Sequence, residues 1–127
     1  MVKNIHREQS AFTLVEIMIV VAIIGLLATL GLPSMIKARK QAQGRRAMND
    51  VRQMDGAIDQ WALEFGKKDG DAIDTNSAAS YLKPTDWETL DPLGRAYVIN
   101  SVGSTQIQIA AATKSALAGV GIEWGAY

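Results

Sequence analysis

A run of 20 residues without a charged side chain, Ile17 to Ile36, constrains this chain more than any other feature. About 20 apolar residues, each rising about 1.5 Å along a helix, match the hydrocarbon thickness of a bilayer. A soluble protein of 127 residues would have difficulty covering a helix that is apolar on every side. The run therefore predicts a membrane-spanning helix. A buried core helix and a cleaved secretory signal, whose apolar region spans about 7–15 residues, are the alternatives.

One acid, Glu16, stands immediately before this run and has apolar neighbours on both sides. Burying an acid at the centre of a bilayer costs roughly 2.5–3.5 kcal/mol on insertion scales, so such acids are candidates for a function with a specific partner. The alternative is an acid that reaches the membrane surface and has no role.

The composition excludes several kinds of site. The chain has no Cys and one His, His6, which excludes a disulfide framework, a thiol nucleophile, an iron–sulfur cluster and any two-His metal site. The 13 basic and 13 acidic residues balance, so no overall field attracts nucleic acid. No Gly-rich phosphate loop follows a predicted strand. We therefore expect no enzymatic activity, no cofactor, no metal and no nucleic-acid partner.

Beyond the apolar run, the hydrophobic pattern becomes one-sided. A stripe with helical spacing comprises Met48, Val51, Met54, Ile58, Trp61 and Phe65, and the opposite face holds Arg45, Arg46, Asn49, Asp50, Gln53 and Gln60. Arg46 and Asp50 are four residues apart, a pair worth about 0.3 kcal/mol. Gly66 predicts the helix end, and 67–71 a loop. One helix of 54 residues, Phe12 to Phe65, is thus predicted, about 80 Å long.

Three residues, Gly25, Gly31 and Pro33, interrupt this helical pattern. An interior Gly costs about 1 kcal/mol relative to Ala, and an interior Pro about 3 kcal/mol. Neighbouring helices can accommodate both residues in a membrane. A simple kink at Pro33 is the plainest interpretation.

Residues 67–127 predict a small module of short elements. Asp74 to Ser77 can cap a helix over Ala78–Leu82 that ends before Pro84, and Lys114–Val120 is either a short helix or an irregular return. The residues Asp69, Asp71 and Asp74 lack the spacing of a calcium loop, so a solvated loop is expected there.

A β-hairpin is the central feature of this module. Asp91 to Gly94 has the composition of a turn, and strands are predicted over Arg95–Asn100 and Thr105–Ala110, joined by a loop that contains Gly103. A two-stranded hairpin is marginally stable alone and needs a helix face to pack on. The apolar stripe of the long helix provides one, so the fold class is α+β.

The stretch Ala11-Phe12-Thr13-Leu14-Val15-Glu16, preceded by the short polar leader Met1–Ser10, resembles the prepilin-type cleavage and methylation motif of type IV pilins and type II secretion pseudopilins. The resemblance implies cleavage between Ala11 and Phe12 by a membrane-embedded prepilin peptidase, and N-methylation of Phe12. Glu16, Gly25 and Pro33 fall where the family has its acid, Gly and Pro. The family usually has Gly before the cut, so Ala11 predicts slower or equivalent cleavage.

The resemblance also implies roles in assembly. Cleavage creates an ammonium group on Phe12, and Glu16 can pair with the ammonium of a neighbouring copy. Isolated charges are unfavourable in a low-dielectric setting. The pair would therefore set the register between subunits. In the family, the helix loses order between residues such as Gly25 and Pro33 when subunits pack. Gly31 lies within that segment.

The sequence gives conflicting indications of how the chain is oriented in the membrane. Lys3 and Arg7 precede the run, whereas five basic residues follow it before the first acid, Asp50: Lys37, Arg39, Lys40, Arg45 and Arg46. A count of Lys and Arg alone favours a cytoplasmic C-terminus. The family implies a cytoplasmic leader and a globular part on the other side, and the motif takes precedence over the count. Without the motif, the chain would be a membrane-anchored cytoplasmic protein.

Asp91-Pro92-Leu93-Gly94-Arg95-Ala96-Tyr97 is similar to a stretch that leads into the sheet of major pseudopilins, and the absence of a Cys pair fits the same branch. Major pseudopilins are associated with a calcium site in an acidic C-terminal loop. The tail Thr113–Tyr127 contains one acid, Glu123, whereas calcium needs 6–8 oxygen ligands, so this site is not expected here.

We therefore predict four segments: a leader (1–11), a transmembrane and filament-core helix half (12–36), an amphipathic helix half (37–66) and a globular module (67–127). The predicted function is a structural, pseudopilin-like filament subunit, inserted in the bacterial inner membrane with its N-terminus cytoplasmic. Its partners would be copies of itself, prepilin peptidase, an assembly platform and a cytoplasmic ATPase. The alternatives are a surface pilin for adhesion, motility or DNA uptake, and a signal-anchored binding module.

Overall fold

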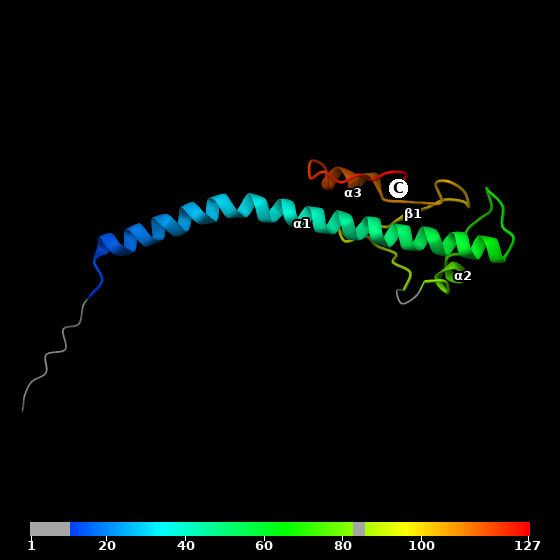
Figure 1. Cartoon of the computed structure of the whole chain (residues 1–127), viewed down its shortest axis with the longest axis horizontal. Coiled ribbons are helices and arrows are strands. Elements are labelled where there is room, and N and C mark those ends of the chain that lie inside the picture. Colours follow the sequence, from blue (N-terminus) through cyan, green and yellow to red (C-terminus); the bar gives the residue numbers. More distant parts are fainter. Residues whose placement is uncertain (1–10, 83–85) are drawn as a thin grey trace, which may run out of the picture. The chain divides into compact units, whose positions relative to one another are not determined.

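The computed structural model describes residues 11–82 and 86–127. The elements follow in the order α1 (Leu14–Glu64), α2 (Thr75–Ala79), β1 (Val98–Ile99), β2 (Ile107–Gln108) and α3 (Ala111–Ala116), as Figure 1 shows. The chain divides into two compact units, one ending at Ile36 and one covering Lys37–Tyr127. A long helix together with a small antiparallel sheet confirms the predicted α+β class. The leader Met1–Ser10, with His6, and Pro84 lie outside the described residues.

The first unit is the apolar part of α1. Every residue from 11 to 36 is exposed, and the helix continues through Gly25, Gly31 and Pro33. Two hydroxyl groups form hydrogen bonds with the helix backbone. Thr29 Oγ1 donates to the Leu26 carbonyl at 2.7 Å, and Ser34 Oγ donates to the Gly31 carbonyl at 2.9 Å. Such bonds satisfy polar side chains without a solvent partner, as an apolar environment requires.

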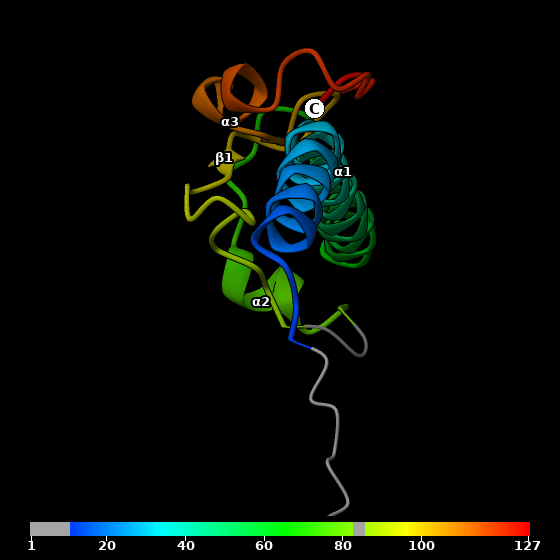
Figure 2. The same ribbon diagram turned by 90° about the vertical axis from the view of Figure 1, so that its left-hand side faces the viewer.

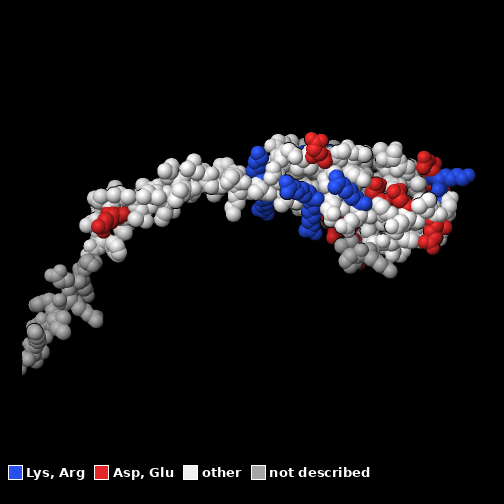
Figure 3. All heavy atoms as spheres, viewed as in Figure 1, with Lys and Arg blue, Asp and Glu red and all other residues white. Residues whose placement is uncertain are grey.

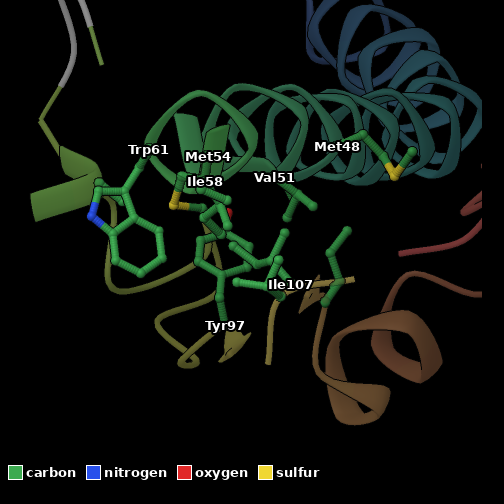
Figure 4. Close-up of a cluster of buried hydrophobic side chains, with 12 residues drawn as sticks. Met48, Val51, Met54, Ile58, Trp61, Tyr97 and Ile107 are labelled. Atoms are coloured by element: carbon green, nitrogen blue, oxygen red, sulfur yellow. The ribbon is translucent and has the colours of Figure 1, made fainter. Parts of the chain in front are cut away.

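In the second unit, the predicted stripe of α1 forms the core. Met48, Val51, Met54, Ile58 and Trp61 are buried, and Figure 4 shows them on the side of the helix that faces Tyr97 and Ile107. Viewed nearly along the helix in Figure 2, the short helices and strands of this unit lie mainly on one side of α1. The amphipathic pattern thus predicted correctly which face of the helix is covered.

Phe65 does not belong to this core, contrary to the prediction. The helix ends at Glu64, and Phe65 is 59% exposed, although its ring lies 6.1 Å from that of Trp61. Gly66 has a φ of +62°, and the N–H groups of Gly66 and Lys67 return to the Leu63 and Ala62 carbonyls at 3.4 and 2.8 Å. This is a Schellman motif, which turns the chain away from the helix before Phe65 can be covered.

The strands are shorter than predicted. β1 and β2 pair antiparallel with Val98 opposite Gln108 and Ile99 opposite Ile107. The expected strand residues on either side have other partners: the Arg95 carbonyl accepts from Asp91 N at 2.7 Å, and Asn100 Nδ2 donates to the Thr105 carbonyl at 2.7 Å. A turn therefore replaces the strand before β1, whereas beyond β1 one further backbone hydrogen bond joins Asn100 N to the Gln106 carbonyl at 2.9 Å.

Both short helices begin three residues earlier than predicted. Asp74 itself is the N-cap of α2, since its Oδ1 accepts from Asn76 N and Ser77 N at 3.1 and 3.3 Å. The helix therefore covers Thr75–Ala79 rather than Ala78–Leu82. α3 ends at Ala116 because Gly119, with a φ of +79°, cannot continue a right-handed helix toward Val120.

Candidate assembly segment

The predicted cleavage site lies immediately outside the helix. Ala11 and Phe12 are exposed and have no regular secondary structure, and α1 begins two residues after Phe12. The helix therefore begins two residues later than the predicted start at Phe12. The peptide bond between Ala11 and Phe12 therefore joins two exposed residues outside the helix.

A reciprocal pair of hydrogen bonds between Thr13 and Glu16 begins the helix. Thr13 Oγ1 accepts from the Glu16 backbone N–H at 3.2 Å, and Glu16 Oε2 accepts from the Thr13 backbone N–H at 3.0 Å. This is a capping box, in which two N–H groups that lack helical partners are satisfied. This arrangement was not among the predictions. Its signal was the Thr-x-x-Glu spacing directly before an apolar run.

The capping box gives Glu16 a local role besides any role between subunits. It engages Oε2 within the same chain, whereas no residue that the structure describes donates a hydrogen bond to Oε1. The carboxylate is therefore held at the helix start with one oxygen accessible. This arrangement could accept an ammonium group from another copy, and that pairing stays a prediction.

Two of the predicted unwinding positions, Gly25 and Gly31, have no neighbouring atoms where a side chain would stand. A Cβ added to Gly25 or Gly31 would meet no atom within 4 Å, so neither glycine is required for packing in the single chain. Pro33 has no N–H for the carbonyl of Thr29, which weakens the helix locally. The helix is intact at all three residues, and their loss of helical order in a filament stays a prediction.

The second unit contains a polar cluster that the sequence analysis missed. Gln106 is only 3% exposed, and its Nε2 donates to the Oδ1 atoms of Asp55 and Asp59 at 2.8 and 2.7 Å. Tyr127 Oη donates to Asp55 Oδ2 at 3.0 Å, and burial, followed by this hydrogen bond, raises the pKa of Tyr127. The cluster joins α1, β2's flank and the C-terminus. Its residues are distant in sequence, so no local pattern signals it.

The Asp91 side chain itself stabilises the predicted turn through hydrogen bonds. It is buried, and its Oδ1 accepts from Leu93 N and Arg95 N, both at 2.9 Å. Its other oxygen accepts a hydrogen bond from the buried hydroxyl of Thr113, at the start of α3. The turn is therefore tied to the C-terminal segment.

Three further acids have structural partners. Asp71 Oδ2 accepts from Lys68 N at 2.9 Å, and Asp74 caps α2. Arg46 Nε lies 3.9 Å from Asp50 Oδ2, which confirms the predicted pair. Over residues 11–82 and 86–127, no group of three His, Cys, Asp or Glu side chains is arranged to hold a metal ion.

Comparison with known proteins agrees with the N-terminal geometry. The family described as "Prokaryotic N-terminal methylation motif" matches residues 6–32. The match supports the predicted resemblance of the N-terminal segment to type IV pilins and pseudopilins. Within the described residues, α1 contains one stretch long and apolar enough to cross a membrane, with a mean hydropathy of 2.6. None of that stretch is buried, as expected for a pilin-like membrane anchor.

The chain is also similar to pseudopilins named "Type II secretion system core protein G". It is 36% identical over 58 residues to that of Aeromonas hydrophila, covering 46% of this chain and 41% of the relative. It is 41% identical over 59 residues to that of Pseudomonas aeruginosa, covering 46% and 42%. The alignments thus span about two-fifths of these relatives. No solved structure matches the pilin-like chain.

Proposed function

We propose that the chain is a structural subunit of a pilus-like filament of the type II secretion kind. The observation that carries this proposal is the fully exposed apolar half of α1, which begins at a capping box containing Glu16. Such a surface requires lipid before assembly and other apolar helices afterwards. Within residues 11–82 and 86–127, α1 has the one apolar stretch long enough to span a membrane, so these partners must come from outside the chain.

In the proposed mechanism, the helix inserts in the inner membrane with the leader on the cytoplasmic side. Prepilin peptidase cleaves between Ala11 and Phe12 and methylates the new amine. The Phe12 ammonium of one copy then pairs with the Glu16 carboxylate of a neighbour. An assembly platform and a cytoplasmic ATPase would provide the force and energy, so the chain itself performs no catalysis.

The names of the relatives support secretion over a surface pilus. Each of the two relatives given above is named as a core protein of type II secretion. We therefore place the filament in the periplasm, as part of a protein transport machine.

Mass spectrometry of the membrane-extracted protein tests the processing step. The expected N-terminus is Phe12 carrying one methyl group. A mature protein that begins at Met1 would contradict the proposal, because the ammonium at Phe12 would never form.

A substitution at Glu16 tests the assembly step. Glu16→Gln retains an oxygen that can accept from Thr13 N, so the helix start should persist while the charge is lost. We expect cleavage to continue and filament formation, counted by electron microscopy, to fail. Glu123→Gln, at an exposed acid of the second unit, is the matched control and should assemble. Normal filaments from Glu16→Gln would show that charge pairing is not needed.

A further inference from the structure

The second unit has a strongly uneven charge distribution. Residues 37–46 contain five basic residues and no acid, whereas residues 47–127 contain six basic and eleven acidic residues. Figure 3 shows the Lys and Arg side chains gathered toward the start of this unit's helix, with Asp and Glu mostly farther along. The net charge near zero therefore conceals a cationic segment next to the apolar run.

Three of these residues follow the apolar run directly: Lys37, Arg39 and Lys40, here called the basic collar. Lys37 and Arg39 are exposed and Lys40 is partly buried. Among the residues that the structure describes, none of the three forms an ion pair, whereas Arg46 lies near Asp50. At about 100° per residue, Lys37 and Lys40 are about 60° apart and Arg39 is about 160° from Lys37, so the three side chains cover nearly half of the helix circumference. A layer of headgroups around the helix can contact all three side chains, because it has no preferred face.

The depth of the collar follows from helical geometry. Lys37 is adjacent to Ile36, the last residue of the uncharged run, and Lys40 is four residues beyond Ile36, about 6 Å along the axis. The headgroup region of a bilayer extends about 5–8 Å beyond the hydrocarbon on each side. The collar therefore lies within that region whenever the run spans the membrane. Long basic side chains can reach the phosphates while their stems stay in apolar surroundings.

We propose that the basic collar binds the phosphate headgroups of anionic phospholipids in the leaflet nearest the globular unit. This inference rests on the membrane insertion included in the proposed function. Each basic residue near an anionic surface contributes about a fivefold increase in binding constant. The bound headgroups would hold the unassembled subunit at one depth, and they would be released when the helix leaves the bilayer.

The experiment uses the full chain in phosphatidylcholine vesicles with a trace of spin-labelled phosphatidylglycerol or spin-labelled phosphatidylcholine. Electron spin resonance measures the fraction of each label that the protein immobilises. We expect a severalfold preference for phosphatidylglycerol at low salt and a marked decrease at high salt, because exposed charges are screened. The variant K37Q/R39Q/K40Q should lose this preference. The control K67Q/K68Q/K114Q removes three positive charges far along the chain and should retain it.

Several outcomes would overturn the proposal. These are no preference in the unmodified chain, a preference insensitive to salt, or one that persists in K37Q/R39Q/K40Q. Self-association that depends on the collar, without lipid preference, would assign the collar to a second copy instead. If the collar variant fails to insert, K37R/K40R keeps the charges and must retain the preference. Flotation with vesicles separates this proposal from the proposed membrane insertion. A chain that does not float contradicts membrane insertion and the lipid site together. A chain that floats but shows no preference contradicts the lipid site alone.

Discussion

Gly44 of α1 lies directly beneath Ile122 of the C-terminal segment. A Cβ added to Gly44 would overlap Cδ1 of Ile122 and lie 3.1 Å from its Cγ1 and 3.5 Å from Trp124. Nearby, Gln41 Nε2 donates to the Val120 carbonyl at 2.9 Å. The absence of a side chain at one helical position thus allows the C-terminal segment to pack against the helix.

Gly44→Ala should therefore be about 1–3 kcal/mol less stable than a helical Gly→Ala change that meets no overlap, because of overpacking. Gly56→Ala is the matched control: Gly56 is also within α1, and a Cβ there meets nothing within 4 Å. It should stabilise the helix by about 0.5–1 kcal/mol. Urea unfolding of the chain in detergent, followed by Trp fluorescence, measures both. Equal stability of the two variants would contradict the close packing of Ile122.

Gln106 provides a second test, because it is the neutral donor between two carboxylates. Gln106→Leu removes the hydrogen bonds to Asp55 and Asp59 and should cost about 1–3 kcal/mol. Gln106→Glu places a third carboxyl group there, and its neighbours should raise its pKa in the folded state. The stability of this variant should then be greatest below the unfolded pKa of about 4.3 and fall as the pH rises through the folded pKa. Unfolding midpoints measured between acidic and neutral pH check this, and a flat profile for Gln106→Glu would contradict it.

Two acids in the second unit should affect stability with opposite signs. Burial, opposed by Arg46, raises the pKa of Asp50 above its usual 3.8, so the folded state binds the proton more tightly. Its contribution is present below the unfolded pKa and is lost as the pH rises. Asp50→Asn should therefore match or exceed the stability of the unmodified chain at neutral pH.

Asp74 should contribute to stability with the opposite pH dependence to that of Asp50. Hydrogen bonds from Ser77 lower the pKa of Asp74, so its contribution is present above 3.8 and is lost as the pH falls through the folded value. Asp74→Ala should weaken the unit at neutral pH and have little effect in acid. Thermal unfolding of Asp50→Asn and Asp74→Ala across this pH range compares the two, and pH dependences of the same sign would show that one assignment is wrong.

A substitution at Pro33 tests the predicted loss of helical order between Gly25 and Pro33. Pro33→Ala restores an N–H for the Thr29 carbonyl and should make this part of the helix more favourable by about 3 kcal/mol. In filaments, the variant should keep helical order between Gly25 and Pro33 and change the subunit rise or the flexibility. Cryo-electron microscopy of variant filaments measures both. An unchanged rise and flexibility would argue against unwinding.

Much of the fold could be predicted from local patterns. The uncharged run from Ile17 to Ile36, the stripe through Met48 and Trp61, and the stop at Gly66 each depend on residues close in sequence. Helical periodicity and the positive φ of glycine are properties of a few consecutive residues, so they can be recognised without the folded chain. The capping box of Thr13 and Glu16 is of the same kind and was also predictable.

Other features depended on contacts between distant residues. Gln106 is buried because Asp55 and Asp59 accept from it across the unit, and Asp91 is buried where Thr113 donates to it. The requirement for Gly44 arises only when Ile122 packs on it. The sequence by itself determined the long helix, its apolar half and the family motif, because these are local. The tertiary structure alone decided the burial of polar groups and the packing of the C-terminal segment on α1, because each requires a partner many residues away.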